Sequence, residues 1–336
     1  MVELWFAFAL VPFALWVVLD GFDLGAALAL PFLARTDAER DEVLQTIGPY
    51  WDANEVWLLA GGGTLFLAFP ALLGAALSGF YLPVMILVWA LMVRGGALEL
   101  RHHVHEAPWR ELLTALVQLS SGAIAFLAAA LLGAAVLGVP LGPDGTFALG
   151  LFSTESGPGA LSFTTAGIGL LGVASVAVQG AFFVAPRVSA PVAERAYALA
   201  RRALAVAGVL FGLLLGRFLA LFPELVLQPS SFALLTLAVM GAVVAFAAAS
   251  RRSPGLGLGS ASLWLLGLTA VGPLARYPVL LASTEGEGLT ARAVAAPEHS
   301  LTAAAPWWPL AVIVAAAWFA VVVRVVRRTT PPSTTS

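Results

Sequence analysis

Long apolar runs alternate with short polar segments along almost the whole chain. A helix needs roughly 20 apolar residues to cross the hydrocarbon core of a bilayer. We therefore predict nine membrane spans, at 4–33, 53–75, 78–100, 112–139, 160–185, 203–226, 231–250, 257–281 and 306–326. This pattern is typical of an all-α, polytopic integral membrane bundle with about nine transmembrane helices.

The positions of arginine test this helix count, because cytoplasmic loops of membrane proteins carry an excess of Lys and Arg. The sequence contains no Lys. Thirteen of its 17 basic residues follow the first, third, fifth, seventh and ninth predicted spans: Arg35, Arg40, Arg101, Arg110, Arg187, Arg195, Arg201, Arg202, Arg251, Arg252, Arg324, Arg327 and Arg328. A wrong helix count would scramble this alternation. The pattern therefore predicts an N-terminus outside the cytoplasm and a C-terminus inside it.

The loops between the predicted spans are too short to form a soluble domain. We expect one transmembrane domain over residues 1–328 and a disordered tail over 329–336, where the sequence reads "TTPPSTTS". Within the domain, "VVLDGFDLG" of the first span resembles "VAVQGAFFV" of the fifth, at the same depth and in the same direction. Two four-helix units plus one helix would produce such a parallel repeat. Chance similarity between two apolar segments explains it at least as well.

Composition narrows the class of protein further. Hydrophobic residues make up 60% of the 336 positions and charged residues 11%, against about 25% charged residues in an ordinary soluble domain. The net charge of −2 indicates no nucleic-acid partner. Because Cys is absent, disulfides and thiolate-held zinc or iron–sulfur sites are excluded. The first apolar run has neither a basic segment nor a cleavage site before it, so we expect it to be a retained span.

Ionisable side chains within the spans are the main candidates for function, because each costs roughly 3 kcal/mol or more in a membrane unless it is paired or hydrated. Asp20 and Asp23 lie three residues apart on one face of the first helix, and Asp52 and Glu55 repeat this spacing at the start of the second. Crowded, buried carboxyl groups take up and release protons, so these four residues predict a proton route from the cytoplasm.

A purely structural interpretation of the same residues stays open. In it, Arg94 of the third span or Arg217 of the sixth would neutralise one of the carboxylates, while Asp52 or Glu55 would cap the second helix.

Histidine restricts the cofactors that the chain could hold. We expect all four His residues, His102, His103, His105 and His299, to lie in loops. A haem held inside the bundle by two His, or by His and Met, is therefore excluded. His102, His103 and His105 could form a loop metal site, but His residues in Arg-containing loops are usually solvated, and we expect no metal. The "GGG" at 61–63 lacks the residues of a phosphate loop and favours close helix packing.

Five stretches of the first third carry a family resemblance: "DGFDLG", "ARTDAER", "TIGPYWDANEVWLLAGGGTLFLAFP", "SGFYLP" and "RGGALELR". Together they closely resemble subunit II of the cytochrome bd family of quinol oxidases. The match is strongest over 15–105 and continues more weakly through "SVAVQGAFF" and "RYPVLL". The block "WDANEVWLL" is its most specific part, although Ala53 stands where the family has Gly.

The resemblance implies a nine-helix subunit that pairs with a larger subunit I in a bacterial or archaeal cytoplasmic membrane. That partner carries two b-type haems and haem d, oxidises quinol and reduces dioxygen to water. It also leaves room for a small single-helix subunit. Subunit II holds no haem, so the resemblance implies no catalytic, cofactor-binding or metal-binding residue in this chain, and no activity of the chain alone.

The resemblance also implies roles for individual residues. Asp52 matches the acid of a proton path that reaches the haem d site, and Glu99 matches the acid of a second proposed proton entrance. Trp57 lies along a hydrophobic route proposed for oxygen. We add Glu55, Asp20 and Asp23 to the proton path as neighbouring acids, with Arg94 as their charge partner.

Two other functions use the same residues. A proton-coupled secondary transporter or channel would need helices broken by Gly or Pro near the middle of the membrane, for which "GGG" at 61–63 is the one candidate. A structural scaffold for subunit I would not need the carboxylates at all.

Overall fold

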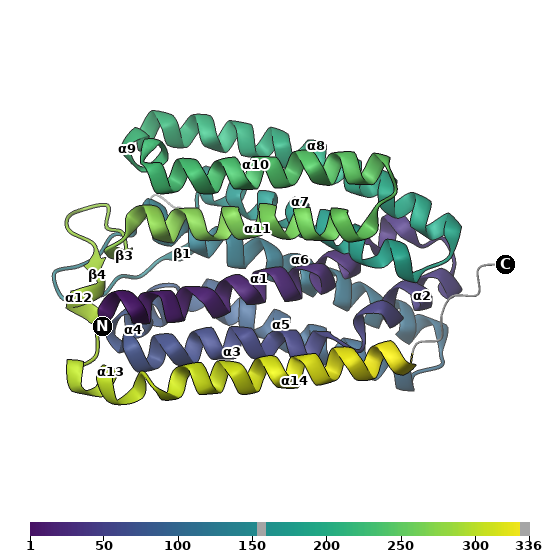
Figure 1. Cartoon of the computed structure of the whole chain (residues 1–336), viewed down its shortest axis with the longest axis horizontal. Helices are drawn as coiled ribbons and strands as arrows, with labels where there is room; N and C mark the ends of the chain where they lie inside the picture. The colour runs from purple at the N-terminus through teal and green to yellow at the C-terminus, as the bar shows by residue number, and fades with distance from the viewer. Residues whose placement is uncertain (153–158, 330–336) are drawn as a thin grey trace.

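The computed structural model describes residues 1–152 and 159–329, which form an elongated bundle of nearly parallel and antiparallel helices (Figure 1). Seven helices are long and apolar enough to cross a membrane: α1 (Val2–Leu33), α5 (Tyr81–His103), α6 (Ala107–Leu137), α7 (Phe163–Val184, continued by the 3-10 turn η1, Ala185–Arg187), α8 (Ala190–Leu221), α10 (Pro229–Ser250) and α11 (Pro254–Arg276).

Two bent helix pairs complete the bundle. The helices α3 (Trp51–Ala68) and α4 (Pro70–Gly79) meet at 117°, and α13 (Glu298–Ala304) meets α14 (Trp307–Thr329) at 41°. If each pair counts as one span, the described residues contain nine, as predicted. The predicted second span over 53–75 is broken into two helices, because the helical conformation is disfavoured for a residue that precedes proline. Phe69, which precedes Pro70, has φ −135° and ψ 57°.

The remaining elements are short and lie at the ends of the bundle. At the end that holds the N-terminus, the outer segments form small sheets and turns (Figure 1). There β1 (Gly150–Phe152) pairs in parallel with β2 (Gly159–Leu161), and β3 (Val279–Leu281) pairs antiparallel with β4 (Leu289–Thr290), followed by α12 (Ala291–Val294). The short α9 (Pro223–Leu227) joins α8 to α10, and α2 (Asp37–Ile47) lies at the opposite end.

The long helices form two four-helix units with the same order of packing. In the first unit, α1 packs against α3 and α6, and α5 packs against α6. In the second unit, α7 packs against α8 and α11, and α10 packs against α11. This correspondence supports the predicted pair of units plus one helix. That last helix, α14, lies along α3, where Trp308 donates a hydrogen bond to Thr64 (2.9 Å) and stacks on Phe8.

The two units meet where α1 crosses α7, and small residues allow their backbones to touch there. A Cβ atom on Gly25 would lie 1.8 Å from the carbonyl oxygen of Val176, and one on Gly180 would lie 2.1 Å from the carbonyl carbon of Gly25. Only glycine fits at both positions. The segment of α1 that carries Asp20 and Asp23 is therefore fixed against the second unit.

Other helix boundaries differ from the prediction by a few residues, with one larger exception. The helix α8 begins at Ala190, well before the predicted start at residue 203, because its first turns are amphipathic and extend beyond the apolar run. The predicted tail over 329–336 lies outside the described residues except for Thr329, which ends α14.

Candidate functional site

A charged cluster lies buried in the first unit, centred on Arg94 of α5. Neither Arg94 nor Asp20 of α1 has exposed surface. Arg94 Nη1 lies 3.0 Å from Asp20 Oδ1 and 3.1 Å from Glu55 Oε1 of α3. The Glu55 side chain is 25% exposed. One guanidinium thus links a fully enclosed carboxylate to a carboxylate that reaches the surface of the subunit.

Hydrogen bonds within the first unit orient the two buried aspartates. Trp16 Nε1, one turn before Asp20, donates to Asp20 Oδ2 at 3.1 Å. Asn54 Nδ2 donates to Asp23 Oδ2 at 2.6 Å and to the Leu19 carbonyl at 3.0 Å. Sequence reasoning gave no role to Trp16 or Asn54. The spacing of four residues between Trp16 and Asp20 was the signal that could have found the first.

The cluster contains more acid than base. Three carboxyl groups surround a single guanidinium, so full ionisation would leave two uncompensated negative charges in a low-dielectric interior, which is costly. Among the described residues, no hydrogen-bond partner is found for Asp23 Oδ1, Asn54 Oδ1, or Arg94 Nε and Nη2. The arrangement therefore favours carboxyl groups that hold and exchange protons, with polar atoms still free to take part.

The other two predicted proton-path acids lie at the surface. Asp52 is exposed in the first turn of α3, one turn before Glu55. The N-cap residue of α3 is Tyr50 and makes no side-chain cap, so the alternative that Asp52 or Glu55 caps this helix is wrong. Glu99 is 69% exposed and lies 3.7 Å from His103 Nε2. It stands five residues beyond Arg94 on a different face of α5, so the structure does not bring it to the cluster.

The remaining candidate residues have separate surroundings. Trp57 is buried in an apolar cluster that also contains Trp16 and Ala90. Arg217 donates from Nε to Thr164 Oγ1 at 2.6 Å, so the alternative that it neutralises one of these carboxylates is wrong. The side chain next to Asp20 and Glu55 is that of Arg94.

Three of the four histidines lie in helices and not in the predicted loops, while His105 lies in a loop as predicted. His102 and His103 form the last turn of α5, and His299 lies in α13, because these helices continue past the apolar runs. His105 follows α5 in the connection to α6. No group of three or more His, Asp or Glu side chains within the described residues is arranged to hold a metal ion.

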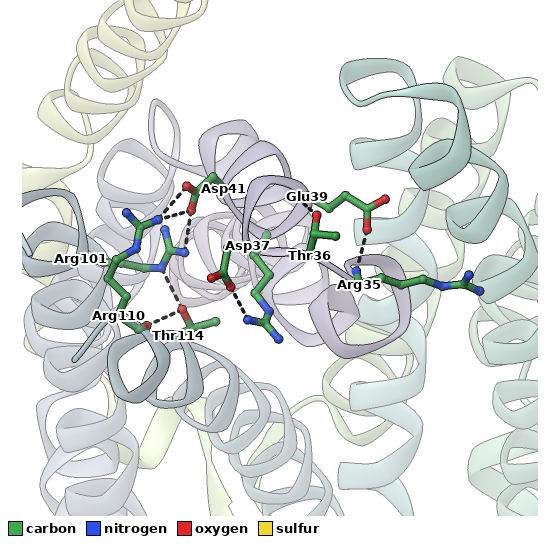
Figure 2. A network of polar contacts seen from close by, with 9 residues as sticks. Arg35, Thr36, Asp37, Glu39, Asp41, Arg101, Arg110 and Thr114 are labelled. Atoms are coloured by element: carbon green, nitrogen blue, oxygen red, sulfur yellow. Dashed lines mark hydrogen bonds and ion pairs between the residues drawn. The ribbon is translucent and has the colours of Figure 1, made fainter. Parts of the chain in front are cut away.

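A second polar network ties α2 to both units, and Figure 2 shows its bonds to Arg101 and Arg110 of the first unit. Asp41 accepts hydrogen bonds from Arg101 of α5 and Arg110 of α6, each at 2.7 Å. On the other side of α2, Glu39 accepts from Arg195 of α8 at 2.6 Å. Burial alone would raise the pKa of Asp41, but Arg101 and Arg110 hold it below its ordinary value. The backbone N–H of Arg35 and then Arg195 lower the pKa of Glu39.

Fold and site together define a polytopic membrane protein of two similar helical units, one of which encloses a buried cluster of carboxyl groups around an arginine. The family model for cytochrome bd terminal oxidase subunit II matches residues 1–326, and the chain belongs to this family.

Individual relatives match shorter segments. The chain is 40% identical over 142 residues to cytochrome bd ubiquinol oxidase subunit 2 of Bacillus subtilis, which covers 42% of each chain. It is 39% identical over 97 residues to cytochrome bd-I ubiquinol oxidase subunit 2 of Escherichia coli K12, covering 29% of this chain and 26% of that one. These matches thus span less than half the length of the curated relatives.

A solved structure shares the fold. The structure of bd oxidase from Geobacillus thermodenitrificans superposes with a TM-score of 0.72 over 96% of this chain and 100% of that chain, at 17% identity. At an identity this low, the comparison shows only that the two folds are alike.

Proposed function

We propose that this chain is the non-haem subunit of a cytochrome bd-type terminal oxidase. With a haem-bearing subunit I, it forms a complex that oxidises quinol and reduces dioxygen to water. Family membership and the names of the relatives support this proposal. The b-type haems and haem d belong to subunit I. The bias in arginine positions supports an orientation in the cytoplasmic membrane with the N-terminus outside and the C-terminus inside.

Within that complex, the acidic cluster would carry protons from the cytoplasmic side. Asp52 lies at the surface, Glu55 follows one turn further into the membrane, and Arg94 connects Glu55 to Asp20. The observation that carries the proposal is the contact of one guanidinium nitrogen with both carboxylates, at 3.0 and 3.1 Å. Arg94 holds the two acids close together, and its delocalised charge stabilises whichever one is ionised.

Asp23 lies one turn nearer the cytoplasmic end of α1 than Asp20 and would share this route. Asn54, which precedes Glu55 on α3, donates a hydrogen bond to Asp23. A carboxyl group there accepts a proton at Oδ1, which has no hydrogen-bond partner among the described residues. Proton transfer then proceeds between neighbouring carboxyl oxygens, and each donor recovers its proton from the group on its cytoplasmic side.

Glu99 and Trp57 would serve two separate routes. Glu99 is exposed next to His103 at the cytoplasmic end of α5 and does not contact the cluster, which suits the acid of a second proton entrance. Trp57 lies among apolar side chains, the surroundings that a neutral diatomic gas prefers to water.

A transporter or channel fits the observed helices less well. That alternative needs a helix broken near the middle of the membrane. The "GGG" at 61–63 lies inside the continuous helix α3, and the break at Phe69 lies at the end of α3 that faces the N-terminal side of the bundle.

The proposal is tested by co-expressing the chain with a family subunit I and purifying the complex through a tag on this chain. We expect b- and d-type haem absorbance to co-purify and quinol-dependent oxygen consumption to follow. The chain expressed alone should be colourless and inactive. A stable, colourless single chain that never captures subunit I would contradict the proposal, as would oxygen consumption by the isolated chain.

A further inference from the structure

A fully buried amide of the second unit contacts the acidic segment of the first. Gln179 lies on α7 and has no exposed surface. Its Nε2 donates to the carbonyl oxygen of Val18 on α1 at 2.9 Å and to Ser262 Oγ on α11 at 2.9 Å. One side chain therefore joins three helices at the point where the two units cross.

The surroundings of Gln179 leave little room for movement. A Cβ atom on Gly21 would lie 2.5 Å from Gln179 Oε1, so the amide presses directly on the α1 backbone next to Asp20. One turn further along, the backbones of Gly25 and Gly180 touch. The amide and the glycines hold the same stretch of α1.

The two carbonyl groups just before Asp20 each accept one side-chain hydrogen bond besides the backbone bonds of the helix. Val18 O accepts from Gln179 of α7, and Leu19 O accepts from Asn54 of α3. Neighbouring carbonyls of a helix point about 100° apart around its axis. Two such bonds from different helices fix the rotation of α1, and that rotation sets where the Asp20 and Asp23 carboxylates point.

The residue type at 179 suits this task. In the alignment of "VVLDGFDLG" with "VAVQGAFFV", Gln179 occupies the position of Asp20 in the other unit. An ionised carboxylate only accepts hydrogen bonds, whereas an amide nitrogen donates two. Both Gln179 Nε2 protons go to acceptors, Val18 O and Ser262 Oγ.

We propose that Gln179 is a positioning residue for the acidic cluster: its bond to the Val18 carbonyl orients α1 so that Asp20 faces Arg94. The expected effect of Gln179 on turnover rests on the proposed proton route. Its expected effect on the environment of the carboxyl groups does not. It assigns a part in the chemistry of the first unit to a side chain of the second.

The test uses Gln179→Met in the assembled oxidase, because Met keeps the length of the side chain and removes both hydrogen bonds. We expect haem content to remain normal and kcat to fall about fivefold, the factor that corresponds to one hydrogen bond of ordinary strength, with KM for quinol unchanged. In pH-jump difference infrared spectra, the carboxyl bands that disappear in Asp20→Asn should shift. Ser262→Ala is the matched control: it removes one bond and leaves the Val18 bond, so both readouts should match the parent.

The outcomes separate this inference from the proposed function. Unshifted carboxyl bands in a haem-replete Gln179→Met oxidase overturn the positioning role, whatever the turnover. Normal turnover in Asp20→Asn overturns the proton route, while a band shift in Gln179→Met would still support positioning. If the Met variant loses haem, Gln179→Asn, which is polar but one methylene too short to reach Val18, replaces it. Haem loss in both variants shows an assembly role instead and overturns the inference.

Discussion

The two four-helix units pack their helices in the same order but have interiors of opposite character. The first unit encloses Asp20 and Asp23 of α1 and Arg94 of α5, with Glu55 of α3 at the edge of the cluster. At the corresponding depth, the second unit encloses neutral groups. There Trp264 Nε1 donates to Ser175 Oγ at 2.8 Å, as Trp16 donates to Asp20 in the first unit.

This difference shows that the helix arrangement does not require buried charge. In the second unit, buried neutral groups such as Trp264 and Ser175 pair without the desolvation cost of ions, and a buried ion pair is weak evidence for stability. The buried charges of the first unit are therefore better explained by the proposed proton route than by stability. Variants that disturb the units one at a time test this conclusion.

The largest effect is expected where the units touch. Gly25→Ala places a methyl group against the Val176 carbonyl of the other unit, and both partners are backbone, so the cost should exceed the ~1–3 kcal/mol of ordinary overpacking. We expect almost no haem-containing complex, measured by absorbance after purification. Gly63→Ala on α3 is the control, because a Cβ there meets nothing within 4 Å. A normal yield of Gly25→Ala would mean that the units can separate without loss.

Removing the buried cation should have the next largest effect. Arg94→Met leaves the Asp20 and Glu55 carboxylates without their partner, and breaking a buried ion pair in this way costs about 3–5 kcal/mol. We expect lower yield and inactivation at a lower temperature, followed through the haem spectrum. Arg217→Met in the second unit loses only a bond to Thr164 and should change little. Equal losses in both variants would remove the distinction between the units.

The proton route predicts a kinetic effect without loss of assembly. Asp20→Asn keeps the shape of the side chain and an acceptor for Trp16 but cannot carry a proton. We expect turnover to fall tenfold or more, about 1.4 kcal/mol on the limiting barrier, with haem content retained. Asp37→Asn, a surface change on α2, is the control for the same substitution. Turnover of Asp20→Asn at the parent rate would exclude Asp20 as an essential carrier.

Asp52, at the entrance of the proposed route, should matter less than the buried Asp20. Asp52 is exposed, so water can deliver protons to Glu55 when its carboxyl group is removed. We expect Asp52→Asn to reduce turnover about threefold, less than 1 kcal/mol on the barrier. Steady-state oxygen consumption in matched preparations would measure this. A drop larger than that of Asp20→Asn would place the limiting transfer at the surface.

The sequence predicted the helices well because each span is a long apolar run, which local composition alone reveals. It did not predict the bend at Phe69, although Pro70 was a visible signal, since the apolar run continues through it. Nor did it predict the early start of α8. Both errors, in the bend at Phe69 and in the start of α8, come from equating a helix with its apolar run.

The site was predictable only in part. The spacing of Asp20 and Asp23 placed them on one face of the first helix. The similar spacing of Asp52 and Glu55 did not reveal that, of these two, only Glu55 meets Arg94. That choice depends on the relative depth of α3 and α5, which no local pattern contains. The contact of Gln179 with α1 joins residues 161 positions apart, and no sequence pattern predicted it.

The smallest expected effect concerns α2, which binds the first unit through Asp41 and the second through Glu39. Asp41→Asn weakens one side of this tie. Because the Asp41 side chain is 34% exposed, we expect a loss of about 0.5–1 kcal/mol at neutral pH, seen as a small drop in the temperature of haem loss. Asp37→Asn, whose partner Arg40 lies on the same helix, should not change it.

The pH dependence of this tie has a definite sign. The pKa of Asp41 is lower in the folded protein than in the unfolded chain, where it is about 3.9, so the ionised form is the one that the fold stabilises. The stabilisation is fully present above the unfolded pKa and is lost as pH falls through the folded pKa. The difference between the parent and Asp41→Asn should therefore stay constant from pH 7 to about 5 and shrink below about 4. A difference that grows on acidification would mean that Asp41 is stabilised in its protonated form, and that α2 holds the units together by some other contact.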